Sequence, residues 1–268
     1  MALPSGWLGQ ADNFLGIDEP WCHPDQAGVY VLPAPYEHTS SYILGSDRGP
    51  SAIIEASQQV ELYDETLRYE PYREWGGVAT AATLNLDGRV DGPAVQAIQD
   101  FVQPHVGRGK FLVTLTGEHT GALGAIRAHA RNYPGMCVVQ IDAHGDLRQA
   151  YQDNPYSHAS VMARVVEDGL PLVQIGVRSI SPEEIDLIQK TPRIHTFFAA
   201  SILDPSGPYE GRAARWIPEV LAACTGPVYL TFDCDGLDAS LVPALGTPEP
   251  GGLGWYDTLA LVTALANG

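Results

Sequence analysis

The segment DAHGD carries three side chains of metal-ligand type at a spacing of two, and it is the stretch best suited to do chemistry. Asp142, His144 and Asp146 follow the apolar residues 138–141, which are typical of a buried strand. Residues two apart in an extended chain point the same way, so the three can converge. Gly145 is expected to let the chain curl as the strand ends. Because clustered carboxylates repel one another without a cation, the pattern predicts a divalent-metal site, with a polar corner between strand and loop as the alternative.

Two other predicted strands also end in residues of this type. Residues 111–115 are followed by TGEHT, which contains His119, and residues 228–232 are followed by DCD, which contains Asp233 and Asp235. Ligands of parallel α/β sheets bind outside the carboxyl ends of the strands. We therefore expect all three strand ends to meet at one sheet edge.

Four carboxylates and two imidazoles exceed the three or four ligands of a single zinc ion. Two ions that share bridging carboxylates fit this number better. The oxygen-rich set favours Mn²⁺, although other first-row metals bind the same groups. A pair of divalent ions lowers the pKa of water toward neutrality and so supplies hydroxide as a nucleophile near pH 7. Cys234 lies between two of the aspartates and, by strand alternation, should point into the core.

Strand and helix patterns alternate along most of the chain, which predicts an α/β fold with a mostly parallel sheet and helices on both faces. Residues 1–26 are expected to form an irregular arm, and residues 60–85 a long aromatic loop. Ser157 is a candidate helix cap, and Ser181 with Glu184 a capping box. The expected strands cover residues 29–32, 111–115, 137–142, 172–177, 194–198 and 228–232; the expected helices cover residues 50–56, 94–102, 123–130, 159–166, 213–223 and 255–266, with another opening at 181.

Composition narrows the class of protein. The chain has 268 residues, of which 45% are hydrophobic and 18% charged, as expected of a globular protein. Its net charge of −17 argues against nucleic acid and favours cationic small molecules and metal ions, although a solvated acidic surface explains much of it. Four cysteines without a C-x-x-C pair indicate neither a zinc ribbon nor a secreted disulfide scaffold. No membrane span or signal peptide is recognisable, so a cytoplasmic location is expected.

The segments TGEHT, DAHGD and TFDCDGLDASLVPALGTPEPGG resemble the signature motifs of the ureohydrolase family of arginases, agmatinases and their relatives. The segment PYEHTSSYILGSDRGPSAIIEAS resembles the agmatinase branch, and the resemblance runs from about Val29 to the end of the chain. It implies a single three-layer α/β/α domain and two Mn²⁺ ions per chain. The implied ligands are His119, Asp142, Asp146 and Asp233 for one ion, and Asp142, His144, Asp233 and Asp235 for the other, with Asp142 and Asp233 bridging.

The resemblance implies hydrolysis of a guanidinium group to urea and an amine. Asp146 would take or orient a proton of the attacking hydroxide, and His158, in YSHAS, would pass a proton to the leaving amine. A lone histidine before a helix is otherwise more often structural. Thr247 and Glu249, in GTPEPGG, lie where the family's loop borders the guanidinium, with the alternative that the Pro and Gly residues there only shape the turn. Glu118 is expected to fix His119 or a nearby loop.

The substrate is expected to be a small cationic guanidino compound. Arginases bind the amino-acid end of arginine with an Asn that follows DAHxD and with an acidic residue that follows a G-x-R segment. In this sequence Arg148 replaces the Asn and Ser181 replaces the acidic residue. Agmatine, cleaved to putrescine and urea, is therefore expected ahead of arginine, with guanidinobutyrate or another guanidino acid as the rival. A homotrimer or homohexamer is expected by the same resemblance, whereas the net charge and the lack of a long apolar run predict no nucleic-acid or membrane partner.

Two other classes of protein remain alternatives. The family continues past the helix that follows GGL with another strand and a glutamate that contacts the guanidinium, whereas the sequence ends at Gly268. The sequence therefore predicts a complete metal site but leaves an inactive metal-binding relative or fragment as an alternative. A single-zinc deacetylase of the same fold would not need His119, Asp146 and Asp235 together.

Overall fold

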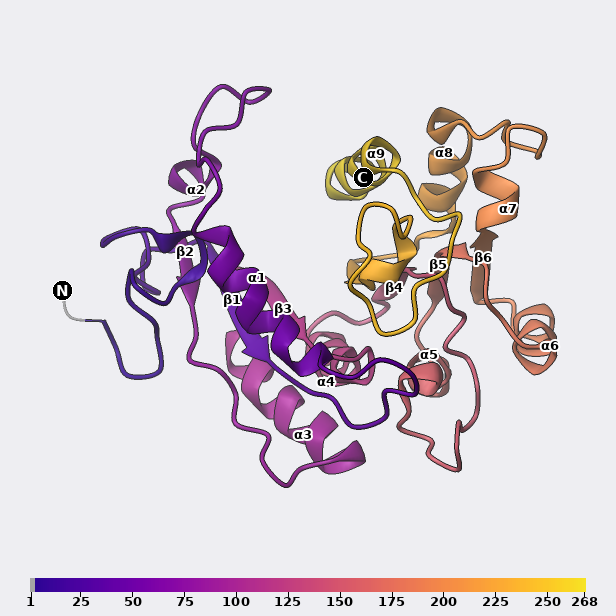
Figure 1. The fold of residues 1–268 in the computed structure, drawn as a ribbon, viewed down its shortest axis with the longest axis horizontal. Coiled ribbons are helices and arrows are strands. Elements are labelled where there is room, and N and C mark those ends of the chain that lie inside the picture. Colours follow the sequence, from indigo (N-terminus) through magenta and orange to yellow (C-terminus); the bar gives the residue numbers. More distant parts are fainter. Residues whose placement is uncertain (1–2) are drawn as a thin grey trace. The chain divides into compact units, whose positions relative to one another are not determined.

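The computed structural model describes residues 3–268, which divide into two compact units. The first unit comprises the chain up to His38 together with Gly45–Asn132. The second comprises Thr39–Leu44 together with Tyr133–Gly268 (Figure 1). Within residues 3–268, no helix is long and apolar enough to cross a membrane.

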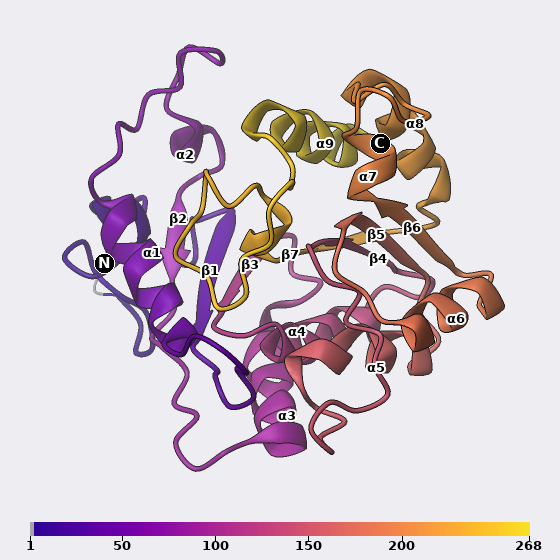
Figure 2. The same cartoon turned by 45° about the vertical axis from the view of Figure 1, so that its right-hand side comes forward.

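The first unit contains a three-stranded parallel sheet with β1 in the centre, in the order β2–β1–β3 (Figure 2). Gly124 permits close packing of the helices α3 and α4, because a Cβ there would lie 2.5 Å from the carbonyl oxygen of Val95. The elements are η1 (Phe14–Gly16), β1 (Val29–Ala34), η2 (Ser46–Arg48), α1 (Gly49–Ser57), α2 (Pro71–Glu74), β2 (Val78–Thr80), α3 (Asp91–Val102), η3 (Gln103–His105), β3 (Phe111–Thr116) and α4 (Thr120–Ala130).

The long loop expected at residues 60–85 is interrupted by two short elements, α2 and β2. Gly76 and Gly77 both have positive φ, a conformation that glycine adopts readily, and they turn the chain into β2. The three residues of β2 form a strand because they pair with β1, and this pairing cannot be read from so short a segment. The arm before β1 is irregular as expected, apart from η1 and one bridge from Trp7 to Ala81.

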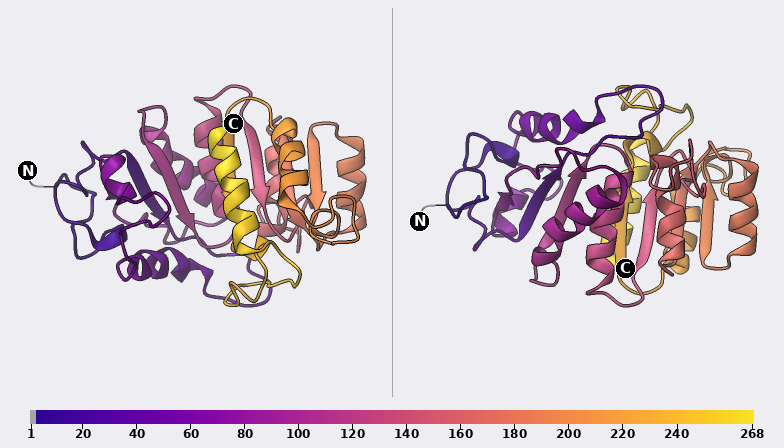
Figure 3. Two further views of the ribbon diagram at one scale, coloured as in Figure 1. Left: turned by 90° about the horizontal axis from the view of Figure 1, so that it is seen from above. Right: turned by 90° about the horizontal axis from the view of Figure 1, so that it is seen from below.

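The second unit contains a four-stranded parallel sheet in the order β6–β5–β4–β7. Helices α8 and α9 cover one face, and α5 and α6 lie on the other (Figure 3). This arrangement confirms the three-layer α/β/α prediction. The elements are β4 (Cys137–Ile141), η4 (His158–Ser160), α5 (Val161–Glu167), β5 (Leu172–Val177), α6 (Pro182–Lys190), β6 (Ile194–Phe198), α7 (Ala199–Ile202), α8 (Ala213–Ala223), β7 (Val228–Phe232), η5 (Cys234–Gly236) and α9 (Trp255–Asn267).

Strand alternation decides which residues of β4 meet α8 and α9. Cys137, Val139 and Ile141 belong to the apolar cluster that contains Trp216 of α8 and Leu261 of α9. The intervening residues of a strand point to the opposite face. One face of the sheet thus packs into an apolar core, whereas the opposite face carries polar side chains, among them those of Gln140 and Gln174.

Two predicted capping residues lie at helix starts, although Ser157 caps the 3-10 turn η4 and the α-helix expected from residue 159 begins at Val161. The side chain of Ser157 accepts the backbone N–H of Ala159 at 3.3 Å. Ser181 and Glu184 form the expected capping box, in which the N–H of Ser181 donates to Oε2 of Glu184 at 2.8 Å. The bounds of α8 and β7 coincide with the expected ones, whereas the short helix α7 was not predicted.

The strand ends are distributed differently from the expectation of a single sheet edge. The neighbouring strands β4 and β7 end together, with Ile141 paired to Phe232. Strand β3 belongs to the first unit. Within residues 3–268 it pairs only with β1 of that unit. The β–α alternation predicts parallel strands but does not specify which strand forms hydrogen bonds with which.

Candidate metal centre

Three potential ligands converge where β4 and β7 end. Asp142 follows β4, His144 lies two residues further on, and Asp235 lies in η5 after β7. One potential ligand atom from each of the three lies within 4.8 Å of the others. Nδ1 of His144 is 2.9 Å from Oδ2 of Asp235 and 3.6 Å from Oδ1 of Asp142. Both aspartate side chains are buried, at 1% and 6% exposure.

The electrostatics of this group favour a positive charge at its centre. Burial alone lowers the pKa of His144, but hydrogen bonds and charges from Asp142 and Asp235 outweigh it and raise that pKa to about 11. Burial and the charge of Asp142 raise the pKa of Asp235 to about 6, against the lowering effect of His144. Two buried carboxylates that favour a proton on the imidazole would equally favour a divalent cation, which binds the neutral ring in place of that proton.

Backbone groups hold the carboxylates in place. The N–H of Ala143 donates to Oδ1 of Asp235 at 3.0 Å, and the N–H of His144 donates to Oδ1 of Asp142 at 2.6 Å. The N–H of Asp233 donates to the carbonyl of Ile141 at 2.9 Å. The ends of β4 and β7 are therefore joined by main-chain contacts beyond the sheet itself.

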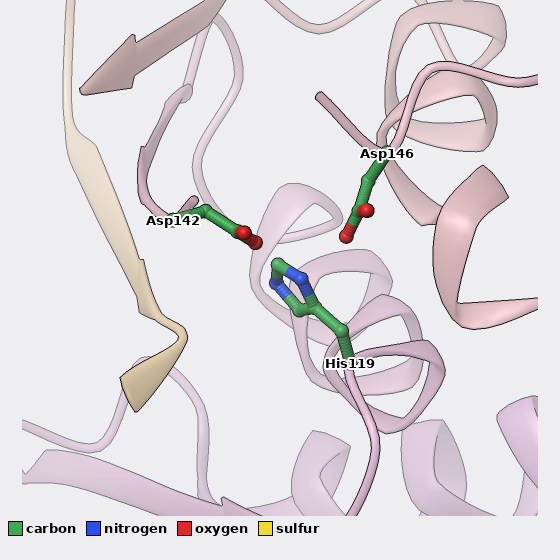
Figure 4. A group of neighbouring side chains, drawn as sticks. All are labelled: His119, Asp142 and Asp146. Atoms are coloured by element: carbon green, nitrogen blue, oxygen red, sulfur yellow. The ribbon is translucent and has the colours of Figure 1, made fainter. Parts of the chain in front are cut away.

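Asp146 reaches the same region by an unexpected backbone conformation. Its φ is +53°, so Asp146, and not Gly145, takes the left-handed conformation at the end of the segment. A Cβ on Gly145 would lie 3.0 Å from Oε1 of Glu184 and 3.1 Å from Cδ1 of Ile180, so a larger residue there would require these side chains to shift. Ligand oxygens of Asp142 and Asp146 lie within 4.8 Å, and the two carboxylates point toward one another (Figure 4).

His119, also drawn in Figure 4, belongs to the first unit, where it is buried and occupies the N-cap position of α4, in the short turn that follows β3. Its neighbour Glu118 accepts the N–H of His38 at 2.9 Å and donates its own N–H to the carbonyl of Tyr36 at 2.8 Å. Glu118 thus fixes a nearby loop, which is one of its two expected roles. The place of His119 among the ligands stays a prediction.

The segment after β7 departs from the extended pattern. Asp233 caps η5, and its Oδ1 accepts the N–H of Asp235 at 3.1 Å. Cys234 is exposed, so the expectation that it points into the core is wrong. The turn of η5 replaces strand alternation at this position, which redirects the thiol. The role of Asp233 as a bridging ligand stays a prediction.

His158 and the loop after η5 supply the other expected site residues. His158 opens η4, and its backbone N–H and ring Nδ1 both contact Oγ1 of Thr39, at 3.0 and 3.1 Å. Oε1 of Glu249 lies 3.9 Å from Nε2 of His144, beside the metal-type group. Thr247 is half-buried in the same loop. Sequence analysis identified His158 but gave no role to Thr39.

Arg178 is a second organising residue that sequence analysis missed. Its Nη2 donates to the carbonyl oxygens of Asp235 and Glu249, both at 2.7 Å, and its Nε donates to that of Pro250 at 2.9 Å. It thereby fastens the loop of Glu249 to the end of β5. Its acceptors are main-chain carbonyls, which every residue has, so the residue types do not reveal these contacts. The only sequence feature that pointed to Arg178 was its position in the G-x-R segment.

Asp238 clasps the two ends of this loop. Its Oδ1 accepts the N–H of Ser240 at 3.0 Å, and its Oδ2 accepts the N–H groups of Gly251 and Gly252 at 3.0 and 3.3 Å. Hydrogen bonds from Ser240 and the two glycines lower the pKa of Asp238 to about 2. Asp238 is thus a turn residue.

Comparison with known proteins identifies the family. Residues 27–268 match the sequence profile of the Arginase family. The chain belongs to the arginase family. It is 43% identical over 265 residues to an N(1)-aminopropylagmatine ureohydrolase of Synechocystis sp., an alignment that covers 97% of this chain and 83% of the relative. It is 30% identical to an agmatinase of Bacillus anthracis, covering 91% of this chain and 81% of the relative.

A solved structure agrees with these relatives. The agmatine ureohydrolase of Thermoplasma volcanium superposes with a TM-score of 0.73 at 30% identity, covering 90% of this chain and 78% of that one. The predicted arginase-like fold and the resemblance to the agmatinase branch are confirmed. This arginase-family protein is an agmatinase-like ureohydrolase, and therefore a hydrolase.

Proposed function

We propose that this arginase-family protein is a binuclear manganese hydrolase that cleaves the guanidinium group of a cationic guanidino-alkylamine and releases urea. The observation that carries the proposal is the buried group of Asp142, His144 and Asp235, whose ligand atoms lie within 4.8 Å of one another and stabilise positive charge. The net charge of −17 supports a cationic substrate, because an acidic surface attracts cations.

The first candidate substrate is N(1)-aminopropylagmatine, which on loss of urea leaves a triamine. It is supported by the 43% identity to the Synechocystis protein of that name and by 33% identity to a second such protein from Thermus thermophilus. Agmatine, which would give putrescine, is the second candidate, supported by the Bacillus agmatinases at 30% identity. The two substrates carry the same guanidinium and differ in the amine beyond it.

Two Mn²⁺ ions would be held by His119, Asp142, Asp146 and Asp233 and by Asp142, His144, Asp233 and Asp235, with Asp142 and Asp233 shared. When bound, they supply a water of lowered pKa that attacks the guanidinium carbon. The buried carboxylates of Asp142 and Asp235 would supply the negative charge that attracts the ions to this position.

The remaining residues handle protons and the substrate. Asp146 accepts or orients a proton of the attacking water, and His158 passes a proton to the leaving amine through its ring. Glu249, whose carboxylate lies beside His144, borders the guanidinium together with Thr247. Arg178 keeps this loop in place through the carbonyl of Glu249.

The decisive experiment is a urea-release screen of the protein supplied with Mn²⁺. The substrates are N(1)-aminopropylagmatine, agmatine, arginine, guanidinobutyrate and guanidinopropionate. We expect the highest kcat/KM with N(1)-aminopropylagmatine, followed by agmatine. A preference for guanidinobutyrate would overturn the cationic assignment, and no release from any of the five would favour an inactive metal-binding relative.

Metal content tests the binuclear site independently of turnover. We expect two Mn²⁺ per chain by elemental analysis and loss of both ions and of urea release in Asp142→Asn, which removes the shared carboxylate charge. One zinc per chain would instead favour a deacetylase-type site. The trimer or hexamer stays a prediction, which light scattering measures.

A further inference from the structure

A row of polar side chains crosses the second sheet at a single register. Gln140 of β4 is paired with Gln174 of β5, and Gln174 is paired with Thr196 of β6. Both glutamines are fully buried, although their strand neighbours are apolar. A buried amide is costly unless its hydrogen bonds are made, so two of them side by side in adjacent strands require an explanation.

The three side chains form a directed chain of hydrogen bonds, called here the glutamine relay. Thr196 Oγ1 donates to Oε1 of Gln174 at 2.8 Å, and Nε2 of Gln174 donates to Oε1 of Gln140 at 2.6 Å. Nε2 of Gln140 then donates to Oδ2 of Asp142 at 2.8 Å. An ionised carboxylate only accepts hydrogen bonds, so Asp142 sets the orientation of both amides.

The remaining amide hydrogens hold the backbone of the DAHGD segment. Nε2 of Gln174 also donates to the carbonyl of Gly145 at 2.7 Å, and Nε2 of Gln140 contacts the carbonyl of His144 at 3.4 Å. The two amides therefore use all of their donor groups on this segment or on each other. The glutamine relay thus contacts the DAHGD segment at the carboxylate of Asp142 and at the carbonyls of His144 and Gly145.

We infer that Gln140 and Gln174 are positioning residues that preorganise Asp142 and the DAHGD backbone for the metal ions. This inference rests on the proposed function. A neutral donor fixes Oδ2 of Asp142 without cancelling its charge, so the carboxylate keeps its attraction for a cation. Hydrogen-bonded supports of this kind hold metal ligands in the binding geometry and raise metal affinity.

The test compares Mn²⁺ binding in Gln140→Met, Gln174→Met and Thr196→Val with that of the unaltered protein. Gln99→Met is the matched control, because Gln99 is also a buried glutamine but lies in α3 of the first unit. Free Mn²⁺ is measured by electron paramagnetic resonance during titration of metal-free protein, and thermal unfolding of the metal-free protein reports folding.

We expect the Mn²⁺ dissociation constant to rise about 10- to 100-fold in the two glutamine variants. A rise of about 3- to 5-fold, above the 2-fold limit set for the control, is expected in Thr196→Val, which removes only the outermost donor of the relay. Gln99→Met should stay within about 2-fold of the unaltered protein, since the amide of Gln99 faces Arg131 within the first unit. The effect of Gln174→Met is the most informative, because the amide of Gln174 donates to Gln140 and to the carbonyl of Gly145 and so acts on Asp142 through Gln140.

Dissociation constants that remain within about 2-fold in every folded variant would overturn the inference. Thr196 is only half-buried, so its variant keeps the test decisive if a glutamine variant fails to fold. The proposed function fails separately, by absence of urea release from an unaltered protein that binds Mn²⁺. Loss of urea release in Gln174→Met that high Mn²⁺ restores would further support positioning of the metal site.

Discussion

The hydroxyl oxygen of Thr39 contacts His158 twice, accepting its backbone N–H at 3.0 Å and lying 3.1 Å from its ring Nδ1. A hydroxyl can donate to a neutral imidazole and accept from a protonated one. Thr39 can therefore hold the ring in one orientation whether or not the ring is protonated. Under the proposed function, Nε2, on the far side of the ring, is the atom that would exchange a proton with the leaving amine.

This contact predicts a specific kinetic effect of Thr39→Val, which keeps the shape of the side chain but removes the hydroxyl. We expect kcat for urea release to fall about 10- to 100-fold, a fraction of the full contribution of a general acid, while KM changes little. Thr39→Ser keeps the hydroxyl and should retain kcat within about 3-fold. Equal kcat values for the valine and serine variants would exclude an orienting role for the hydroxyl.

Arg178 predicts a coupling between loop stability and activity. Arg178→Met removes charge-assisted hydrogen bonds to the carbonyls of Asp235, Glu249 and Pro250. We expect the free energy of unfolding in urea to fall by about 2–4 kcal/mol, since hydrogen bonds to charged groups contribute roughly 1.5–3 kcal/mol each and the loop can partly rehydrate. kcat/KM should fall as well, because Glu249 is no longer held.

The matched control for this variant is Arg193→Met, which removes a bond to the single carbonyl of Val166. It should lower stability less and leave kcat/KM unchanged, because Val166 lies away from the loop of Glu249. A similar loss of kcat/KM in both variants would mean that the effect is general destabilisation.

Asp238 predicts a pH-dependent contribution to stability. Its folded pKa of about 2 lies below the ordinary value of 3.8, so folding is favoured by the ionised form. The contribution is complete above the unfolded value and is lost as pH falls from about 4 toward 2. The urea midpoint of Asp238→Asn should therefore lie below that of the unaltered protein at pH 7, with a gap that narrows at pH 3. A gap of the same size at both pH values would contradict the assignment.

Metal removal predicts a loss of stability that depends on the Asp142, His144 and Asp235 group. A ligand that binds only the folded state adds about 2.7 kcal/mol at 100 times its dissociation constant. We expect Mn²⁺ to raise the unfolding temperature of the chelator-treated protein, and Asp235→Asn to abolish most of that rise. Asp186→Asn, at an exposed ion pair with Lys190 in α6, should respond to Mn²⁺ as the unaltered protein does.

Local sequence was sufficient where structure depends on near neighbours. The helix at Ala213–Ala223, the strand at Val228–Phe232 and the capping box of Ser181 and Glu184 were predictable, because apolar period and capping chemistry act over a few residues. The approach of Asp142, His144 and Asp235 was also predictable in outline, since adjacent parallel strands present their carboxyl ends together.

Tertiary structure decided what depends on the pairing of distant segments. Thr39 and His158 are 119 residues apart, and the local sequence around either residue does not predict their contact. Gln140 and Gln174 look like polar interruptions in two apolar strands until the register of the sheet places them side by side. The exposed Cys234 and the left-handed Asp146 likewise follow from how the chain leaves its strands. The sequence by itself determined most of the helices and strands and the kinds of candidate ligand. Packing determined which side chains meet, because hydrogen bonds between distant segments depend on which strands pair.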